Sequence, residues 1–83
     1  MTPPKGRLAE VVRDIVAELA QTPQAEIQGT DRLREDLGLD SLQSMELLSR
    51  VSETFDIDPD MEEVMAVETV DGVVAALAGH LAP

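Results

Sequence analysis

The sequence predicts a small all-α protein: a four-helix bundle of three longer helices and one short third helix, with a long loop between the first two. Apolar residues recur at spacings of three and four in several segments, and residues that commonly cap helices precede them. No strand pattern or internal repeat is present. With 83 residues, of which 43% are hydrophobic, residues 1–83 suffice for one domain with a single core. That core must be aliphatic, because Phe55 is the only aromatic residue.

The first predicted helix follows a short N-terminal segment. Residues 1–6 contain two prolines and a glycine, so we expect them to be disordered. The helix should end at Thr22, since Pro23 disfavours helical geometry in the residue before it. Its apolar stripe consists of Leu8, Val11, Val12, Ile15, Val16 and Leu19.

Residues 22–40 are predicted to form the long loop. A bare loop of this length would be unusual in a compact domain. We therefore expect four apolar side chains to anchor it across the helices, and residues 31–36 to form a short helical turn. The anchors are Ile27, Leu33, Leu37 and Leu39.

The second helix is predicted to begin at Asp40 or Ser41 and to end near Phe55. Asp40 can cap it, and Gln43, three residues on, can complete a capping box. Its predicted apolar stripe comprises Leu42, Met45, Leu48, Val51 and Phe55, widened by Leu47.

Two further helices are predicted near the C-terminus. Asp58 and Pro59 are typical of a helix start and predict a short helix over 59–66. Thr69 should cap the last helix, in which Gly72 costs about 1 kcal/mol relative to alanine. The apolar stripe of this last helix is Val70, Val73, Val74, Leu77 and Leu81.

Charge and composition exclude several classes of partner. The net charge of −11 repels nucleic acid and anionic lipid and attracts basic protein surfaces. The chain has no cysteine, no apolar run long enough to cross a membrane, and no apolar segment typical of a signal peptide. Since the sequence begins with Met1 and ends at Pro83, we expect a free-standing protein. The absence of cysteine fits a reducing cytoplasm, so we expect a cytoplasmic protein, and we expect it to be a monomer.

Catalytic and metal sites are not expected. His80 should lie in the last helical turn, where an imidazole can complement the helix dipole. The residues around Ser41 lack the glycines of a nucleophile elbow. Residues 56–60 resemble the start of a calcium loop, but Met61 occupies the glycine position, so at most weak divalent binding is expected.

Three methionines have two possible roles. They can line an adaptable cavity for an acyl chain, or fill gaps in the core, which we favour for at least one of them. The three are Met45, Met61 and Met65.

Ser41 is the principal candidate site. Its position at the loop-to-helix junction predicts an exposed hydroxyl beside the positive end of a helix, with no base to activate it. A serine that is presented but not activated indicates attachment of a group by another enzyme. Apolar Leu42 and Met45 lie close by, and acidic side chains surround the same helix. The acidic residues are Asp36, Asp40, Glu46 and Glu53.

Residues 38–42, Gly-Leu-Asp-Ser-Leu, resemble the attachment motif of acyl carrier proteins. The likeness extends to the order of the helices over nearly the whole chain. The resemblance implies that a phosphopantetheinyl transferase, using magnesium, attaches 4′-phosphopantetheine from coenzyme A to Ser41. The thiol of that group would hold acyl thioesters, and the protein would have no chemistry of its own.

The resemblance also implies that the second helix is the recognition surface for partner enzymes. Asp40, Leu42, Met45, Glu46 and Glu53 match the family pattern there. Many fatty-acid carriers instead have acidic or apolar residues where this chain has Gln43, Ser49 and Ser52.

The implied partners are separate ketosynthases, acyltransferases or ligases of a dissociated, type II system. The departures on the second helix favour a polyketide or related pathway over primary fatty-acid synthesis.

Two other functions stay open from the sequence. A stand-alone peptidyl or aminoacyl carrier shares the fold and the serine, although such domains commonly place glycine and histidine before the serine, where this chain has Leu39 and Asp40. An acidic helical adapter would use Leu42 and Met45 for docking and carry no prosthetic group.

Overall fold

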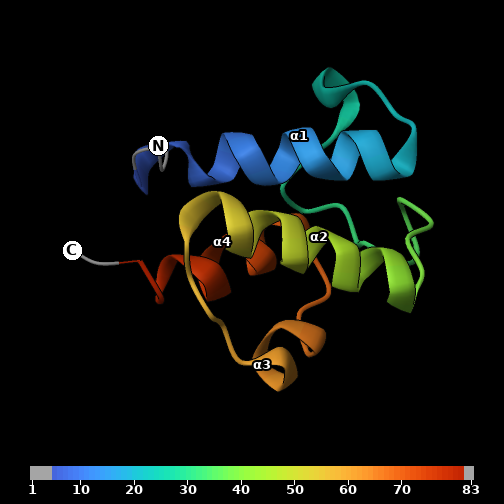
Figure 1. Ribbon diagram of the computed structural model, residues 1–83. Coiled ribbons are helices and arrows are strands. Elements are labelled where there is room, and N and C mark those ends of the chain that lie inside the picture. The colour runs from blue at the N-terminus through green and yellow to red at the C-terminus, as the bar shows by residue number, and fades with distance from the viewer. Residues whose placement is uncertain (1–4, 82–83) are drawn as a thin grey trace.

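The computed structural model describes residues 5–81 and is helical (Figure 1). Its α-helices are α1 (Leu8–Ala20), α2 (Ser41–Phe55), α3 (Met61–Met65) and α4 (Val70–Ala78). Two short 3-10 turns, η1 (Lys5–Arg7) and η2 (Gln24–Glu26), flank α1. The described residues form no strand beyond an isolated bridge between Arg32 and Thr69, which confirms the all-α prediction.

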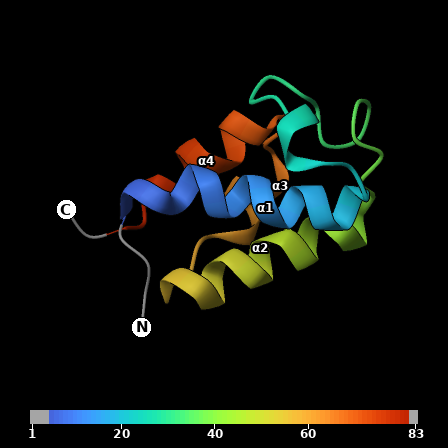
Figure 2. The same ribbon diagram turned by 90° about the horizontal axis from the view of Figure 1, so that it is seen from above.

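The helix α1 packs against both α2 and α4, and the short α3 contacts α2 and α4 on the side away from α1 (Figures 1 and 2). Between them lies one aliphatic core that also includes Phe55. None of the helices in the described part of the chain is long and apolar enough to span a membrane.

The start of α2 is as predicted. Asp40 has an extended backbone and its Oδ1 accepts a hydrogen bond from the Gln43 amide at 2.8 Å. The Gln43 side chain accepts from the Asp40 amide at 3.1 Å, which completes the capping box. This pair fixes the residue at which the helix begins.

The predicted apolar stripe of α2 is only partly correct. Leu47, Leu48, Val51 and Phe55 are buried, whereas Leu42 is 74% exposed and Met45 41% exposed. Leu42 precedes Val51 by nine residues, about two and a half helical turns, so the two side chains point in nearly opposite directions.

The loop between α1 and α2 is anchored as predicted. Ile27, Leu33 and Leu39 are buried and Leu37 is half-buried. A helical turn closes over 32–38, with the Asp36 amide 3.0 Å from the Arg32 carbonyl and the Gly38 amide 3.1 Å from the Arg34 carbonyl. The turn at η2 was not predicted.

Backbone hydrogen bonds also tie this loop to the start of α4. The Leu33 amide donates to the Glu68 carbonyl at 2.8 Å, and the Val70 amide donates to the Asp31 carbonyl at 3.1 Å. A third bond joins the Asp71 amide to the Gly29 carbonyl at 2.8 Å. The loop is therefore fixed by two kinds of contact, its buried apolar side chains and its backbone hydrogen bonds to the start of α4.

Two predictions near the C-terminus are wrong in detail. The cap of α3 is Asp60 and not Asp58: its Oδ1 accepts from the Glu62 amide at 3.0 Å. Starting at Met61 places Glu62 and Glu63 in the first turn, where acidic side chains complement the helix dipole. The predicted Thr69 cap is confirmed, but α4 ends at Ala78, before the residues at positions 80 and 81 that we expected inside it.

Of residues 1–6, which we expected to be disordered, residues 1–4 lie outside the described residues, and the expectation is wrong for the last two. Lys5 and Gly6 belong to the turn η1.

Candidate functional site: the start of α2

Ser41 is the first residue of α2 and its side chain is exposed. The Asp40 carboxylate accepts a hydrogen bond from the Gln43 amide, and the Ser44 amide donates to the Asp40 carbonyl at 3.0 Å. The amides of Ser41 and Leu42 have no hydrogen-bond partner among the described residues. The hydroxyl therefore lies beside unpartnered N–H groups at the positive end of a helix.

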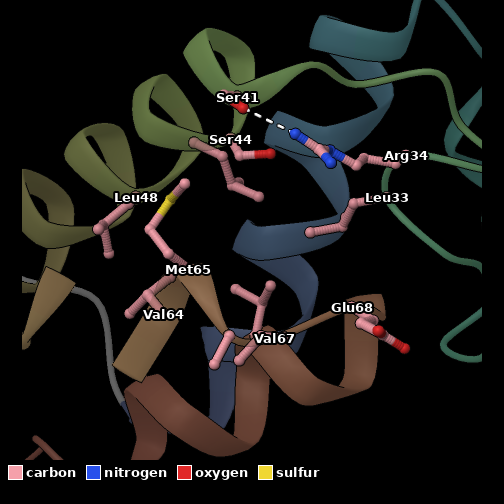
Figure 3. A pocket seen from close by; sticks show the side chains of 12 residues that line it. Leu33, Arg34, Ser41, Ser44, Leu48, Val64, Met65, Val67 and Glu68 are labelled. Atoms are coloured by element: carbon pink, nitrogen blue, oxygen red, sulfur yellow. Dashed lines mark hydrogen bonds between the residues drawn. The ribbon is translucent and has the colours of Figure 1, made fainter. Parts of the chain in front are cut away.

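The Ser41 hydroxyl contacts a cation that the sequence analysis missed. The Nη2 atom of Arg34 donates a hydrogen bond to the Ser41 Oγ at 2.8 Å (Figure 3). Arg34 belongs to the helical turn before α2, and Gly38, with φ of 70°, redirects the chain between the two residues. The available signal was an arginine seven residues before the serine in a strongly acidic chain.

No base contacts this hydroxyl in the described part of the chain. His80 instead lies with its Nε2 atom 3.2 Å from the Glu63 Oε2, beyond the end of α4, so its predicted place in the last helical turn is wrong. The described residues contain no group of three or more side chains suited to hold a metal ion. Within residues 5–81, Ser41 therefore has an exposed side chain and no contact that would activate it as a nucleophile.

The predicted recognition residues lie on α2 and on the loop before it. Leu42 and Met45 form an exposed apolar spot next to Ser41. Glu53 is exposed further along α2. Asp36 does not lie on the helix: its Oδ2 accepts from the Arg32 amide at 2.7 Å and closes the preceding turn.

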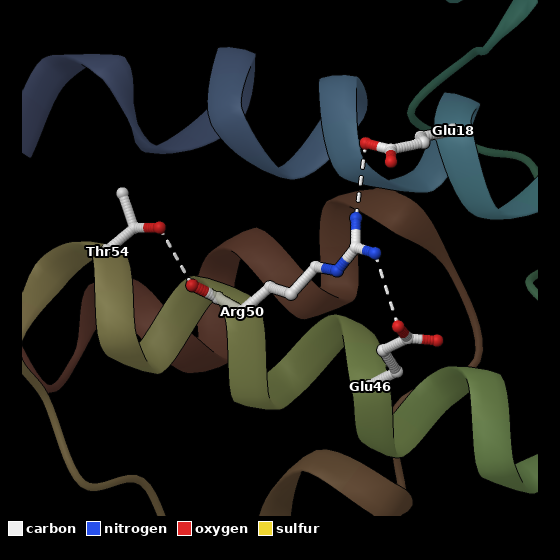
Figure 4. A network of polar contacts seen from close by, with 4 residues as sticks. All are labelled: Glu18, Glu46, Arg50 and Thr54. Atoms are coloured by element: carbon white, nitrogen blue, oxygen red, sulfur yellow. Dashed lines mark hydrogen bonds and ion pairs between the residues drawn. The ribbon is translucent and has the colours of Figure 1, made fainter.

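Glu46 is partly neutralised by Arg50 (Figure 4). The Arg50 guanidinium lies 3.2 Å from the Glu46 Oε1 and 3.1 Å from the Glu18 Oε2 on α1. The hydrogen bond with Glu18 is the largest cause of a pKa of Arg50 raised above its ordinary value. Arg50 thus joins α2 to α1. It also offsets the negative charge of Glu46, so the recognition surface on α2 is less negative there than the net charge of the chain suggests.

A cavity of about 420 Å³ opens beside Ser41 (Figure 3). Arg34, Ser41 and Ser44 form a polar part of its wall, and its apolar wall includes Leu47, Leu48 and Met65. Met65 is 45% exposed and lines this space, whereas Met45 is not among its lining residues. The side chain of Met61 lies outside the described residues.

Comparison with known proteins places the chain in a family. Residues 10–77 match the family model for the phosphopantetheine attachment site. The chain is 32% identical over 71 residues to Acyl carrier protein 3 of Ralstonia nicotianae, which covers 86% of this chain and 82% of that protein. The chain belongs to the acyl carrier protein family. Acyl carrier proteins bear covalent 4′-phosphopantetheine and are not enzymes, and they interact with phosphopantetheinyl transferases and biosynthetic enzymes.

The residues at the start of α2 fit this prosthetic group. An exposed hydroxyl can be esterified, a guanidinium lies 2.8 Å from it, and two helix amides next to it are unpartnered among the described residues. Phosphate is bound favourably at such helix starts.

Proposed function

We propose that Ser41 carries the 4′-phosphopantetheine group and that this acyl carrier protein shuttles acyl thioesters between separate enzymes of a dissociated polyketide or fatty-acid-type pathway. The observation that carries the proposal is the exposed Ser41 hydroxyl, which lies at the start of α2 and on the wall of the cavity. The prosthetic group supplies the thiol that the cysteine-free chain lacks.

The chain's own residues hold and present that group. Asp40 and Gln43 fix the first turn of α2, and with it the direction of the Ser41 hydroxyl. The cavity has the size of small-ligand sites, and Leu47, Leu48 and Val64 offer an aliphatic cargo an apolar surface. This supports an apolar acyl cargo over a charged one.

Partner enzymes would dock on the exposed apolar spot of Leu42 and Met45. Around it, Asp40, Glu46 and Glu53 supply negative charge that favours a basic partner surface and speeds its association. In this proposal the protein acts as a cytoplasmic monomer that meets its transferase, ketosynthase, acyltransferase or ligase one at a time.

The proposed type of pathway is argued from three uncharged residues of α2, Gln43, Ser49 and Ser52. Two of these positions also serve the fold, because the Gln43 side chain forms the capping box and the Ser52 hydroxyl donates to the Leu48 carbonyl at 2.7 Å. Ser49 is exposed. A less acidic recognition face supports a polyketide-type partner, and the thioester that co-purifies with the protein would decide between this and a fatty-acid or aminoacyl cargo.

Intact-mass spectrometry tests the attachment directly. The protein is incubated with coenzyme A, magnesium and a broad-specificity phosphopantetheinyl transferase. We expect wild type and the Ser44→Ala control to gain one phosphopantetheinyl group, and Ser41→Ala to gain none. Ser44 is the matched control because it lines the same cavity three residues further along α2.

Modification of Ser41→Ala would place the attachment elsewhere. An unmodified wild type, under conditions that modify a known carrier, would leave the acidic adapter as the better interpretation.

A further inference from the structure

We infer that Arg34 is the counter-ion of the phosphodiester formed on Ser41 and holds the first segment of the prosthetic arm against the mouth of the cavity. This inference rests on the proposed attachment to Ser41. It concerns a residue of this chain outside the Gly-Leu-Asp-Ser-Leu motif.

The hydrogen bond between Arg34 and Ser41 is the feature of Arg34 that points to an anion site. Arg7, Arg32 and Arg50 each form an ion pair with a carboxylate. Arg34, like Arg13, forms no ion pair with the described residues, although the sequence contains 17 acidic residues. Its guanidinium instead donates to the neutral hydroxyl of Ser41. A cation that contacts a neutral oxygen in so acidic a protein is well placed for an anion formed on that oxygen.

Modification converts this contact into a stronger one. The Arg34 Nη2 atom lies 2.8 Å from the oxygen that would bond to phosphorus. The non-bridging phosphate oxygens would be only two bonds from that oxygen, which brings them within reach of the guanidinium. The phosphodiester carries a full negative charge, and arginine binds phosphate oxygens through several N–H groups at once. The same side chain would therefore hold the modified serine more tightly than the unmodified one.

The backbone around Arg34 is well fixed. Its neighbour Leu33 is buried, and the Leu33 amide bonds the Glu68 carbonyl at 2.8 Å. The Arg34 carbonyl accepts from the Gly38 amide at 3.1 Å. Arg34 and Ser41 both line the cavity, as Figure 3 shows. An ion pair made here would keep the start of the arm at the cavity mouth, which favours entry of its cargo.

The test is a thermodynamic cycle that compares the effect of modifying Ser41 on stability in the presence and in the absence of the Arg34 side chain. Unmodified and modified forms of wild type and Arg34→Ala are melted at low salt and followed by circular dichroism. For each protein, the change in Tm on modification is the Tm of the modified form minus that of the unmodified form. We expect this change to be about 3–6 °C more positive in wild type than in Arg34→Ala. This difference should shrink at about 1 M salt, where the screening length falls to about 3 Å.

The matched control is Arg32→Ala, which removes the same charge two residues away. Arg32 pairs with Glu35 and does not contact Ser41, so its cycle should show no such difference. Arg34→Lys keeps the positive charge but loses the planar set of N–H donors of the guanidinium, so it should retain part of the Tm difference. The phosphorus NMR signal of the modified protein should shift in Arg34→Ala and not in Arg32→Ala.

The outcomes separate this inference from the proposed function. If wild type gains the group but modification changes Tm equally in wild type and Arg34→Ala, and the phosphorus signal is unchanged, Arg34 is not the counter-ion and Ser41 remains the attachment site. If wild type gains no group, both proposals fail. Should Arg34→Ala not fold, Arg34→Gln provides the same comparison with a neutral side chain of similar length.

Discussion

Replacing Phe55 by alanine tests whether the small core depends on its single aromatic ring. Phe55 is the last residue of α2 and is only 3% exposed within the core cluster. Phenylalanine-to-alanine substitutions at buried sites cost about 3–5 kcal/mol, through lost transfer energy and the cavity left behind. At about 0.05–0.15 kcal/mol per residue, 83 residues correspond to a total stability of about 4–12 kcal/mol. The substitution should therefore remove a large part of the free energy of unfolding.

The position of Phe55 favours the lower end of that range. A helix end can collapse toward a cavity more readily than a helix centre, and the cost depends on how well the site can collapse. Because the chain has no tryptophan or tyrosine, urea unfolding must be followed by circular dichroism. Leu42→Ala is the matched control, since that side chain is 74% exposed and its loss should change stability by less than about 0.5 kcal/mol. A loss below about 1 kcal/mol for Phe55→Ala would show that the ring contributes little to the core.

Three further substitutions test the local structure and the recognition surface. Asp40→Ala breaks the capping box with Gln43 and should lower the free energy of unfolding by about 1 kcal/mol, measured in urea. Gly38→Ala should lower the free energy of unfolding by about 1–2 kcal/mol, because φ is 70° at this position. The control Gly6→Ala, where no atom lies within 4 Å of the added carbon, should be near neutral. Equal effects of the two substitutions would contradict the role of the backbone angle. Glu53→Gln should slow association with a basic partner enzyme at low salt and leave the melting curve unchanged; a lower Tm would show that Glu53 supports the fold.

The parts of the fold that the sequence predicts are those specified by neighbours in the chain. The start of α2 follows from Asp40 and Gln43, three residues apart, and the cap of α4 follows from Thr69, whose Oγ1 accepts from the Gly72 amide at 3.0 Å. Such signals act within one helical turn. The start of α3 was misplaced because Asp58 and Asp60 are both suitable caps, and local pattern does not decide between them.

The parts that sequence reasoning missed depend on contacts across the chain. Ser41 was found because it stands in a contiguous motif at a helix start. Arg34 was not, because its contact with Ser41 requires the chain to reverse between them at Gly38. In the same way, Met65 is distant from Ser41 in sequence yet lines the same cavity. No spacing rule predicts which side chains a folded loop brings to a given hydroxyl.

The loop before α2 is best understood as part of the site and not as a connector. The anchor Leu33 and the Leu39 side chain are buried, and the Leu39 amide donates to the Leu33 carbonyl at 2.8 Å, which closes the segment that contains Arg34. The bonds from this loop to Glu68 and Val70 connect the same segment to the start of α4. The position of the arginine beside Ser41 therefore depends on the packing of the whole domain, so a change that loosens the cap of α4 should also loosen the contact at the attachment serine.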